Sequence, residues 1–286
     1  MPTVKEVFGF LPYSVWDLKK PKSLMELIRD TGDPTGKKRT DNSNRKIPNY
    51  RYSIFNPAVA DRIIRYYSNE GDKIVDPCGG RSTRGVMSII LGRNYEGYEI
   101  APETHKMTVE QLEATKTNFE TKGDFVLHHG DGCLLSNTPD KSCDLAFTCP
   151  PYHQQEKYES FPGQLSDINS YEGFLDKIGL MAKSMFRVLK NNTPCVWVIN
   201  DWRDSGEYRC FHGDSIDIFR DAGFKMWDVI INVLHVPWAG VGVATWAERY
   251  RAVKSHEYIL VFAKGDLRRT GLRLSEENIK SWESFV

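Results

Sequence analysis

A strand, a glycine-rich break, a helix and a second strand follow one another in residues 72–100, which read DKIVDPCGGRSTRGVMSIILGRNYEGYEI. The short apolar run before Asp76 predicts a buried strand, and the two glycines after it predict a turn whose backbone can approach a ligand closely. Ser82 and Thr83 predict a side-chain cap for the next helix, which Gly92 ends. This order is the building unit of an α/β sheet.

The same alternation continues on both sides of this stretch. Helical spacing marks residues 57–68, 104–119, 171–190 and 214–224, and apolar strand-like runs mark residues 124–132, 143–152, 193–203, 225–236 and 255–265. We therefore expect the α/β class: a doubly wound, mostly parallel seven-stranded sheet. No clear helix separates the last two strands, which predicts an antiparallel hairpin at one edge.

We expect three regions in the 286 residues: an N-terminal arm, partly irregular and basic, at 1–52, a catalytic domain at 53–270, and a C-terminal tail at 271–286. Lysine plus arginine balances aspartate plus glutamate, 38 each, so no overall basic charge points to a polyanion. The exception is a local basic segment between Gly36 and Arg51, which contains only one acid, Asp41. This segment either contacts a polyanion or is a solvated loop.

The sequence shows neither a membrane span nor a secretory signal nor a cysteine pair with metal-ligand spacing. No apolar run approaches the roughly 18–20 residues of a membrane span, and the first ten residues lack the apolar stretch of a secretory signal. We expect a cytoplasmic protein with no membrane partner. Six cysteines are present without a C-x-x-C pair, so we expect no metal site.

Acidic residues end three successive predicted strands: Asp76, Glu99 and Asp131. Carboxyl ends of parallel strands meet at one edge of a sheet, where ligands bind. We expect Asp76 to accept a hydrogen bond from a cofactor amino group, Glu99 to accept both ribose hydroxyls of a nucleoside, and Asp131 to contact the adenine amino group. The spacings G-x-G-x-x-G and G-K-[ST] are absent, which argues against nicotinamide cofactors and P-loops.

The most specific feature is the end of the fourth predicted strand, Thr148-Cys149-Pro150-Pro151-Tyr152. Adjacent prolines fix the backbone and donate no hydrogen bond, so carbonyls there can face a ligand. An exocyclic amino nitrogen is a poor nucleophile, and two acceptors on its hydrogens free its lone pair. Thr148 Oγ1 and the Pro150 carbonyl are the expected acceptors, and Tyr152 is expected to stack on the base. The other interpretation is a purely structural diproline turn.

Together these stretches resemble the amino-group DNA methyltransferases (N4-cytosine or N6-adenine), in the compact form found in phages and mobile elements. DPCGGRSTRG resembles their first motif, TCPPY their TSPPY and DPPY forms, and YSIFNP at 52–57 the motif that lines the methionine end of the cofactor. The resemblance runs from about Ser53 to Gly265. It implies S-adenosyl-L-methionine as cofactor, DNA as partner and a flipped-out target base.

The resemblance also implies the site residues. The catalytic set is Thr148, Cys149, Pro150, Pro151 and Tyr152. The cofactor-binding set is Ser53, Phe55, Asn56, Asp76, Pro77, Cys78, Gly79, Gly80, Ser82, Thr83, Glu99, Ile100, Asp131 and Gly132. Cys149 invites comparison with C5-cytosine enzymes, but those carry Pro-Cys rather than Cys-Pro, so we interpret it as a small packing position.

Two positions depart from the family pattern: Cys78 stands where phenylalanine is usual and Ser82 where glycine is usual. These departures leave open a degraded binding module. RNA and protein glutamine are the alternative substrates, and the target base, the recognition sequence, the oligomeric state (monomer or homodimer) and a restriction–modification context stay open.

Substrate recognition has three candidate regions. Residues 153–170 close over the flipped base or form a surface loop, and residues 200–203 border the pocket. DNA contacts are expected from 37–46 and from 237–254, where the candidates are Trp238, Trp246, Arg249, Arg251 and Lys254.

Overall fold

The computed structural model describes residues 13–18, 55–153, 161–204, 206–234, 250–252 and 254–269. The predictions for the basic segment 36–51, for Ser53, for residues 154–160 of the predicted loop, for most of 237–254 and for the tail 271–286 lie outside these residues. No helix in the described part of the chain is long and apolar enough to cross a bilayer.

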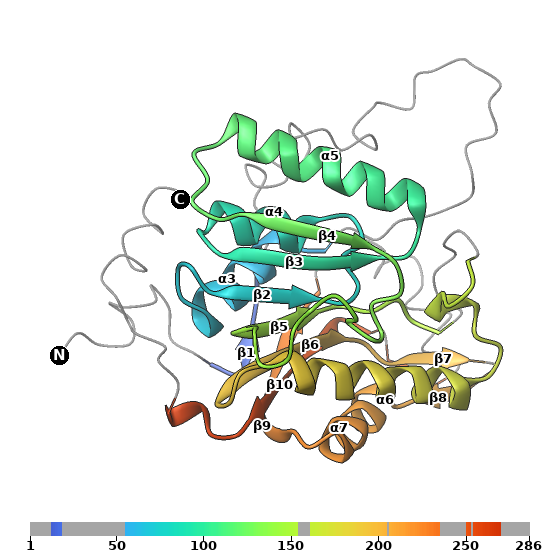
Figure 1. The fold of residues 1–286 in the computed structure, drawn as a ribbon. Coiled ribbons are helices and arrows are strands. Elements are labelled where there is room, and N and C mark those ends of the chain that lie inside the picture. Colours follow the sequence, from blue (N-terminus) through green and yellow to red (C-terminus); the bar gives the residue numbers. More distant parts are fainter. Residues whose placement is uncertain are drawn as a thin grey trace.

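The described residues form one large sheet with the strand order β1-β9-β10-β6-β5-β2-β3-β4 (Figure 1). The strands are β1 (Val15–Trp16), β2 (Lys73–Asp76), β3 (Asn94–Glu99), β4 (Phe125–His129), β5 (Leu145–Thr148), β6 (Thr193–Ile199), β9 (Lys225–Val233) and β10 (His256–Lys264). The five strands from β4 to β6 are parallel, and β10 runs antiparallel to β6 and β9. The expected α/β fold class, with its antiparallel hairpin, is confirmed.

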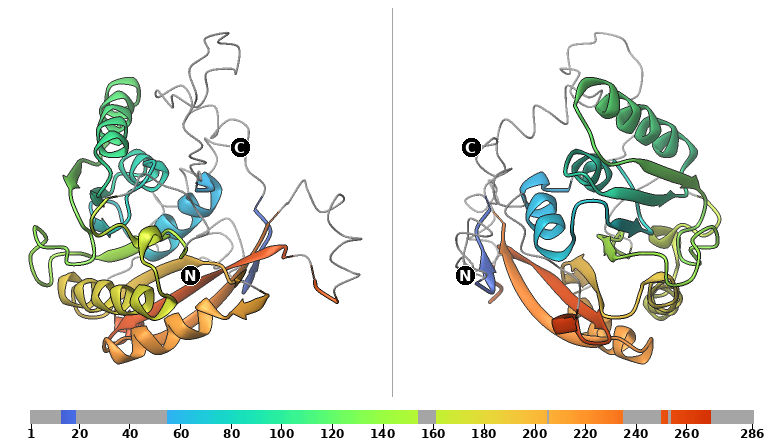
Figure 2. Two further views of the ribbon diagram at one scale, coloured as in Figure 1. Left: turned by 90° about the vertical axis from the view of Figure 1, so that its right-hand side faces the viewer. Right: turned by 60° about the vertical axis from the view of Figure 1, so that its left-hand side comes forward.

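Helices cover both faces of this sheet, as the alternating sequence predicted (Figures 1 and 2). The helices are α3 (Pro57–Tyr67), α4 (Thr83–Ile90), α5 (Pro102–Asn118), α6 (Tyr171–Val188) and α7 (Phe211–Asp221). Successive strand residues point to opposite faces, so Ile74 packs in the core with α3 while Val75 packs in the core with α6 and α7. Burial on both faces explains the uninterrupted apolar strand runs.

Three details differ from the sequence expectations. Ser82 makes no side-chain cap bond to α4, because its backbone is left-handed (φ 58°) and its hydroxyl donates instead to Gln111 Oε1 on α5. The strand predicted over 193–203 ends at Ile199. Residues beyond it form a separate hairpin, β7 (Trp202–Asp204) with β8 (Glu207–Arg209). The helix predicted from 214 begins at Phe211.

One further strand comes from the N-terminal arm. Val15 and Trp16 pair in parallel with β9, and the Trp16 side chain is buried among α3, β9 and β10. Pro12 interrupts the apolar residues before this segment, and two residues are too few to be recognised as a strand, so only the tertiary structure places them against the sheet edge.

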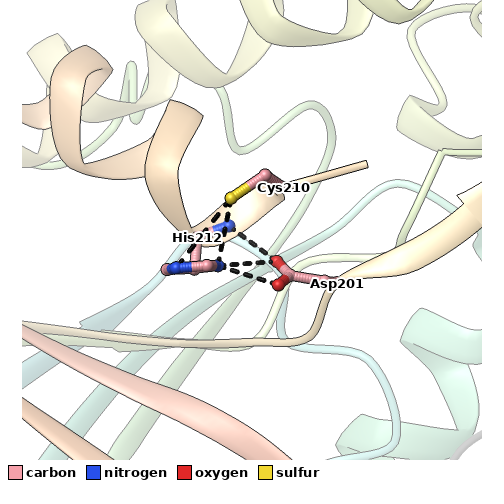
Figure 3. A group of neighbouring side chains, drawn as sticks. All are labelled: Asp201, Cys210 and His212. Atoms are coloured by element: carbon pink, nitrogen blue, oxygen red, sulfur yellow. Dashed lines mark hydrogen bonds and ion pairs between the residues drawn. The ribbon is translucent and has the colours of Figure 1, made fainter. Parts of the chain in front are cut away.

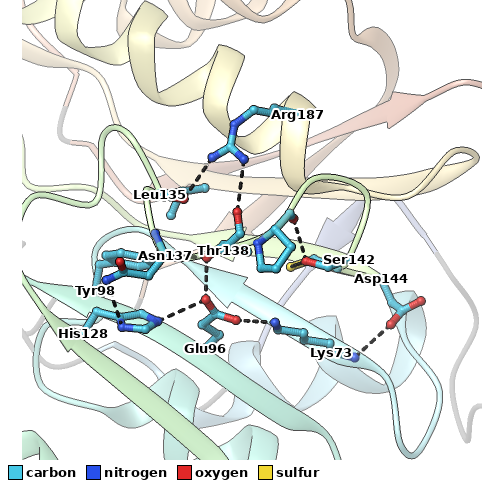
Figure 4. Close-up of polar contacts among 12 residues, drawn as sticks. Lys73, Glu96, Tyr98, His128, Leu135, Asn137, Thr138, Ser142, Asp144 and Arg187 are labelled. Atoms are coloured by element: carbon cyan, nitrogen blue, oxygen red, sulfur yellow. Dashed lines mark hydrogen bonds and ion pairs between the residues drawn. The ribbon is translucent and has the colours of Figure 1, made fainter.

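A buried polar network holds the connection between β4 and β5 (Figure 4). Glu96, on β3, accepts hydrogen bonds from Lys73 Nζ, Thr138 Oγ1 and His128 Nε2, the last at 3.1 Å. Burial alone would raise the pKa of Glu96, but the hydrogen bonds from Lys73 and Thr138 outweigh it and lower the pKa. Arg187 of α6 donates to carbonyls of the same connection. This network fixes the loop whose far end leads into β5.

Candidate active site

The predicted site residues gather where the parallel strands β2, β3, β4, β5 and β6 have their carboxyl ends, at one edge of the sheet. This is the position that α/β sheets use for ligands. β2 lies between β3 and β5. The glycine-rich loop after β2 therefore has the Glu99 end on one side and the Thr148 end on the other.

Asp76 connects these two sides. Its side chain is fully buried, and its Oδ1 accepts hydrogen bonds from Thr148 Oγ1 at 2.7 Å and from Cys78 N at 3.0 Å. Its Oδ2 accepts from Arg84 Nε at 2.7 Å and from Tyr95 Oη at 3.0 Å. Four protein donors surround the carboxylate, so Asp76 positions both the glycine-rich loop and the turn after β5. Its contact with a cofactor amino group stays a prediction.

Glu99 ends β3 beside the glycine loop. Its Oε2 accepts from Gly80 N at 3.0 Å, and its Oε1 accepts from Ala101 N at 2.8 Å. Burial raises the pKa of this carboxyl against the opposing effect of those backbone hydrogen bonds. A carboxylate offers about four acceptor positions, so this one can still accept from a further donor, as the predicted contact with the ribose hydroxyls requires.

The glycines of the loop lie where side chains would not fit. Gly79 N donates to Tyr98 O at 2.7 Å, and a Cβ on Gly79 would lie 3.1 Å from that oxygen. Gly132, after β4, sits so close to the Pro77 carbonyl that a Cβ would be 2.0 Å from it. A side chain at either position would push the neighbouring strand ends apart. Because both residues are glycine, the strand ends lie close together and main-chain atoms form the surface there.

Asp131 lies beside Lys177 of α6, which the sequence did not mark, and beside Gly163 of the predicted loop 153–170. Its Oδ1 accepts from Cys133 N at 2.8 Å, and its Oδ2 lies 3.3 Å from Lys177 Nζ of α6. A Cβ built on Gly163 (φ +94°) would lie 3.4 Å from Asp131 Oδ2 and 3.3 Å from Ile100 Cδ1. Gly163 therefore lies beside Ile100 and Asp131, two residues of the predicted cofactor-binding set. A glycine in a loop carries no signal of such a distant contact.

The start of α4 and the segment before α3 complete this side. Thr83 Oγ1 is buried and has no hydrogen-bond partner among the described residues. Phe55 packs edge-on to Phe147 of β5 at 5.7 Å and lies under the Arg84 guanidinium. Asn56 is the N-cap of α3, where its Oδ1 accepts from Ala58 N, and its contact with the cofactor stays a prediction.

The diproline turn follows β5 directly. Thr148 and Pro150 are buried, and Cys149, Pro151 and Tyr152 are half-buried. Because Thr148 Oγ1 donates its proton to Asp76, this oxygen anchors the turn and is left with acceptor capacity only. Cys149 packs against the core around Phe147 and β10, in agreement with its interpretation as a packing position.

Aromatic rings form the wall beside Tyr152. The Tyr152 and Trp202 centroids lie 5.8 Å apart, and Trp202 also contacts Tyr171 and Phe174 of α6. Of the predicted border residues, Trp202 therefore lies at the turn. Trp202 Nε1 and Ser166 Oγ are buried without hydrogen-bond partners among the described residues. An apolar wall with buried polar atoms suits a planar heterocycle.

Comparison with known proteins gives one family. A family model described as DNA methylase, for N6 and N4 methyltransferases, matches residues 12–110 and 143–284. The chain is 23% identical over 145 residues (51% of this chain, 47% of the other) to the orphan methyltransferase M.BamHII of Bacillus amyloliquefaciens. It is 31% identical over 103 residues (36% and 28%) to the DNA adenine methyltransferase YhdJ of Escherichia coli K12. The aligned part thus spans about half or less of these curated relatives.

Among solved structures, the [4+2]-cyclase SpnF matches with a TM-score of 0.50 at 14% identity, covering 77% of this chain and 89% of that one. A likeness at this identity supports the α/β fold and says nothing of chemistry.

Proposed function

The chain belongs to the DNA methylase family of N6 and N4 methyltransferases, and from that premise we propose that it transfers a methyl group from S-adenosyl-L-methionine to the exocyclic amino group of cytosine or adenine in DNA. One observation carries the proposal. The diproline turn after β5 is hydrogen-bonded through Thr148 to Asp76, at the start of the loop whose backbone binds Glu99. Methyl donor and base would then meet at one sheet edge.

The residues on the cofactor side fit the donor. Glu99 offers two oxygens for ribose hydroxyls, Gly79 and Gly80 offer an approachable backbone, and Thr83 offers a buried hydroxyl without a partner among the described residues. Ile100, directly after Glu99, and Asp131, which follows the neighbouring strand β4, are the proposed contacts of the adenine. The bound cofactor supplies a methyl group on a positively charged sulfonium, so positioning accounts for most of the catalysis.

The residues on the other side act on the base. Tyr152 stacks on it, and the Pro150 carbonyl accepts one amino hydrogen. Thr148 Oγ1 has its proton committed to Asp76 and is the acceptor for the second hydrogen. Because Thr148 is buried, it reaches the base only if the turn shifts when the base enters.

Methyl transfer onto unmethylated DNA, followed by nucleoside mass spectrometry, tests the proposal and names the base. RNA and protein run beside DNA as alternative substrates. Methylation of RNA or of protein glutamine without methylation of DNA would show that DNA is not the substrate. Pro151→Ala should lower transfer sharply while the cofactor affinity stays nearly unchanged, and full activity in that variant would refute the role of the turn.

The degraded-module alternative has two observations in its favour, the residues at positions 78 and 82. Ser82 adopts a left-handed backbone, which costs a non-glycine residue about 1 kcal/mol or more. The hydrogen bond from its hydroxyl to Gln111 compensates, so the loop is formed despite the substitution. Calorimetry with S-adenosyl-L-methionine decides, since absence of binding would favour the degraded module.

A further inference from the structure

A second group of chemically active side chains, which includes the neighbour of Trp202 in the chain, lies where β6 ends and α7 begins (Figure 3). Asp201 follows β6, Cys210 follows β8, and His212 lies in the first turn of α7. We propose that these three residues bind one divalent transition-metal ion, and that Zn²⁺ suits the set because thiolate, imidazole and carboxylate are all zinc ligands.

The distances bring all three groups to one ring nitrogen. His212 Nδ1 lies 2.8 Å from Asp201 Oδ2 and 3.6 Å from Cys210 Sγ, and the three candidate ligand atoms lie within 4.8 Å of one another. With Zn–S near 2.3 Å and Zn–N near 2.0–2.1 Å, tetrahedral geometry separates sulfur and nitrogen by about 3.6 Å and nitrogen and oxygen by about 3.3 Å. Binding therefore requires Asp201 to withdraw by about half an ångström.

A thiol–imidazole–carboxylate catalytic triad is the competing interpretation of the same residues. In such a triad the carboxylate and the nucleophile bond to opposite ring nitrogens. Here the sulfur is farther from His212 Nε2 (3.9 Å) than from Nδ1, the nitrogen that already faces Asp201. Convergence on one nitrogen favours a shared ion.

The surroundings hold the ligands in place independently of any ion. Asp201 has a fully buried side chain, and its carboxylate accepts from Tyr208 Oη at 2.8 Å and from His212 N at 3.0 Å. The His212 ring stacks on Tyr258 with centroids 4.1 Å apart. Outer contacts of this kind orient metal ligands. Of the six cysteines, all of which are described, Cys210 alone is exposed, so the ion has a path to the site.

One neighbour opposes a cation. Lys254 Nζ donates to the main-chain oxygen of Asp201, and burial lowers the pKa of this lysine. Its charge weakens cation binding, so Lys254→Met should tighten it. The ion would tie the β6–β7 junction to the start of α7, directly behind Trp202, and act as a structural clamp independent of methyl transfer.

Spectroscopic titration of the full chain with Co²⁺, paired with calorimetry using Zn²⁺, tests the site. The expected result is one ion per chain with a thiolate-to-cobalt charge-transfer band, which Cys210→Ser and His212→Asn both remove. His256→Asn is the matched control, because His256 also packs against Tyr258 (5.1 Å) but lies outside the cluster, and it should keep the band.

Alkylation gives a second readout that needs no variant. Zn²⁺ should slow iodoacetamide modification of Cys210, read by peptide mass spectrometry, by about 10-fold or more, because the metal-bound thiolate is no longer the attacking nucleophile. Absence of the cobalt band in the wild-type protein, its persistence in Cys210→Ser, or unchanged Cys210 alkylation would overturn the proposal. Since Cys210 is exposed, its serine variant should fold and keep the test valid.

Discussion

The two sides of the sheet edge are built from different interactions. On the cofactor side, main-chain amides of Cys78, Gly80 and Cys133 bind the carboxylates of the residues that end β2 and β3 and of Asp131, which follows β4. On the base side, side-chain rings define the surface, with Tyr152 against Trp202 and Trp202 against Phe174 of α6. Main-chain hydrogen bonds tolerate substitution of neighbouring side chains, whereas a stacking wall depends on each ring. Mutations should therefore separate donor binding from transfer, except at the residue that joins the two sides.

The largest effect is expected at that junction. Asp76→Asn keeps the shape of the side chain but leaves the buried Arg84 without a charged partner. Breaking a buried ion pair in this way costs about 3–5 kcal/mol in the free energy of unfolding. Urea unfolding measures this change. The double variant Asp76→Asn, Arg84→Met should recover most of it, and an unaltered urea midpoint in the single variant would show that Asp76 does not join the two sides.

The next effect separates the cofactor side. Glu99→Gln removes the charge that would accept the ribose hydroxyls, a contribution of about 1.5–3 kcal/mol, so the Kd for S-adenosyl-L-methionine should rise roughly 10- to 100-fold. The variant should still transfer methyl groups at saturating donor. Calorimetry gives the Kd, and a lowered saturated rate with an unchanged Kd would reverse the assignment of the two sides.

The same residue predicts a pH dependence. Burial raises the pKa of Glu99 above its usual 4.5, so donor affinity should begin to fall at a higher pH than an exposed carboxyl would allow. The sign for stability is opposite: a raised carboxyl pKa means that the folded protein binds the proton more tightly, so this residue favours folding as the pH falls through that range. Glu99→Gln should flatten the acid limb of the affinity profile.

On the base side, Tyr152→Ala should lower the transfer rate with little change in donor Kd. Loss of one stacked ring removes about 1–3 kcal/mol, or roughly 5- to 150-fold in rate. Tyr152→Phe keeps the ring and should retain most of the activity. Single-turnover methylation measures the rate. A wild-type rate in Tyr152→Ala would show that the ring of Tyr152 does not take part in methyl transfer.

The smallest effect is expected at Gly163, where the loop after the diproline turn lies against Ile100 and Asp131 on the cofactor side. Gly163→Ala adds a methyl beside Ile100 and Asp131 and strains a backbone at φ +94°, so donor Kd should rise a few-fold, equivalent to about 1 kcal/mol. Gly206→Ala is the matched control, because Gly206 has the same φ but no atom within 4 Å of the added Cβ. Equal donor Kd values for the two variants would show that Gly163 does not affect the cofactor side.

The sequence predicted those parts of the site that depend on chain order. Acids at successive strand ends and the diproline turn had to meet at one edge, because parallel strands connected by helices all end on the same side. It missed that Gly163 and Lys177 reach Asp131 from segments 32 and 46 residues away in the chain (163 minus 131 and 177 minus 131). Neither residue has a local pattern that marks a distant contact.

The sequence by itself determined the α/β fold, the strands that carry the site and the family, because hydrophobic period and strand-end chemistry are local properties of the chain. Only the tertiary structure decided that Asp76 is buried beneath Thr148 and Arg84, that Val15 and Trp16 extend the sheet, and that Asp201, Cys210 and His212 converge on one nitrogen. Those outcomes depend on which side chains become neighbours when helices and strands pack, and spacing along the chain does not encode it.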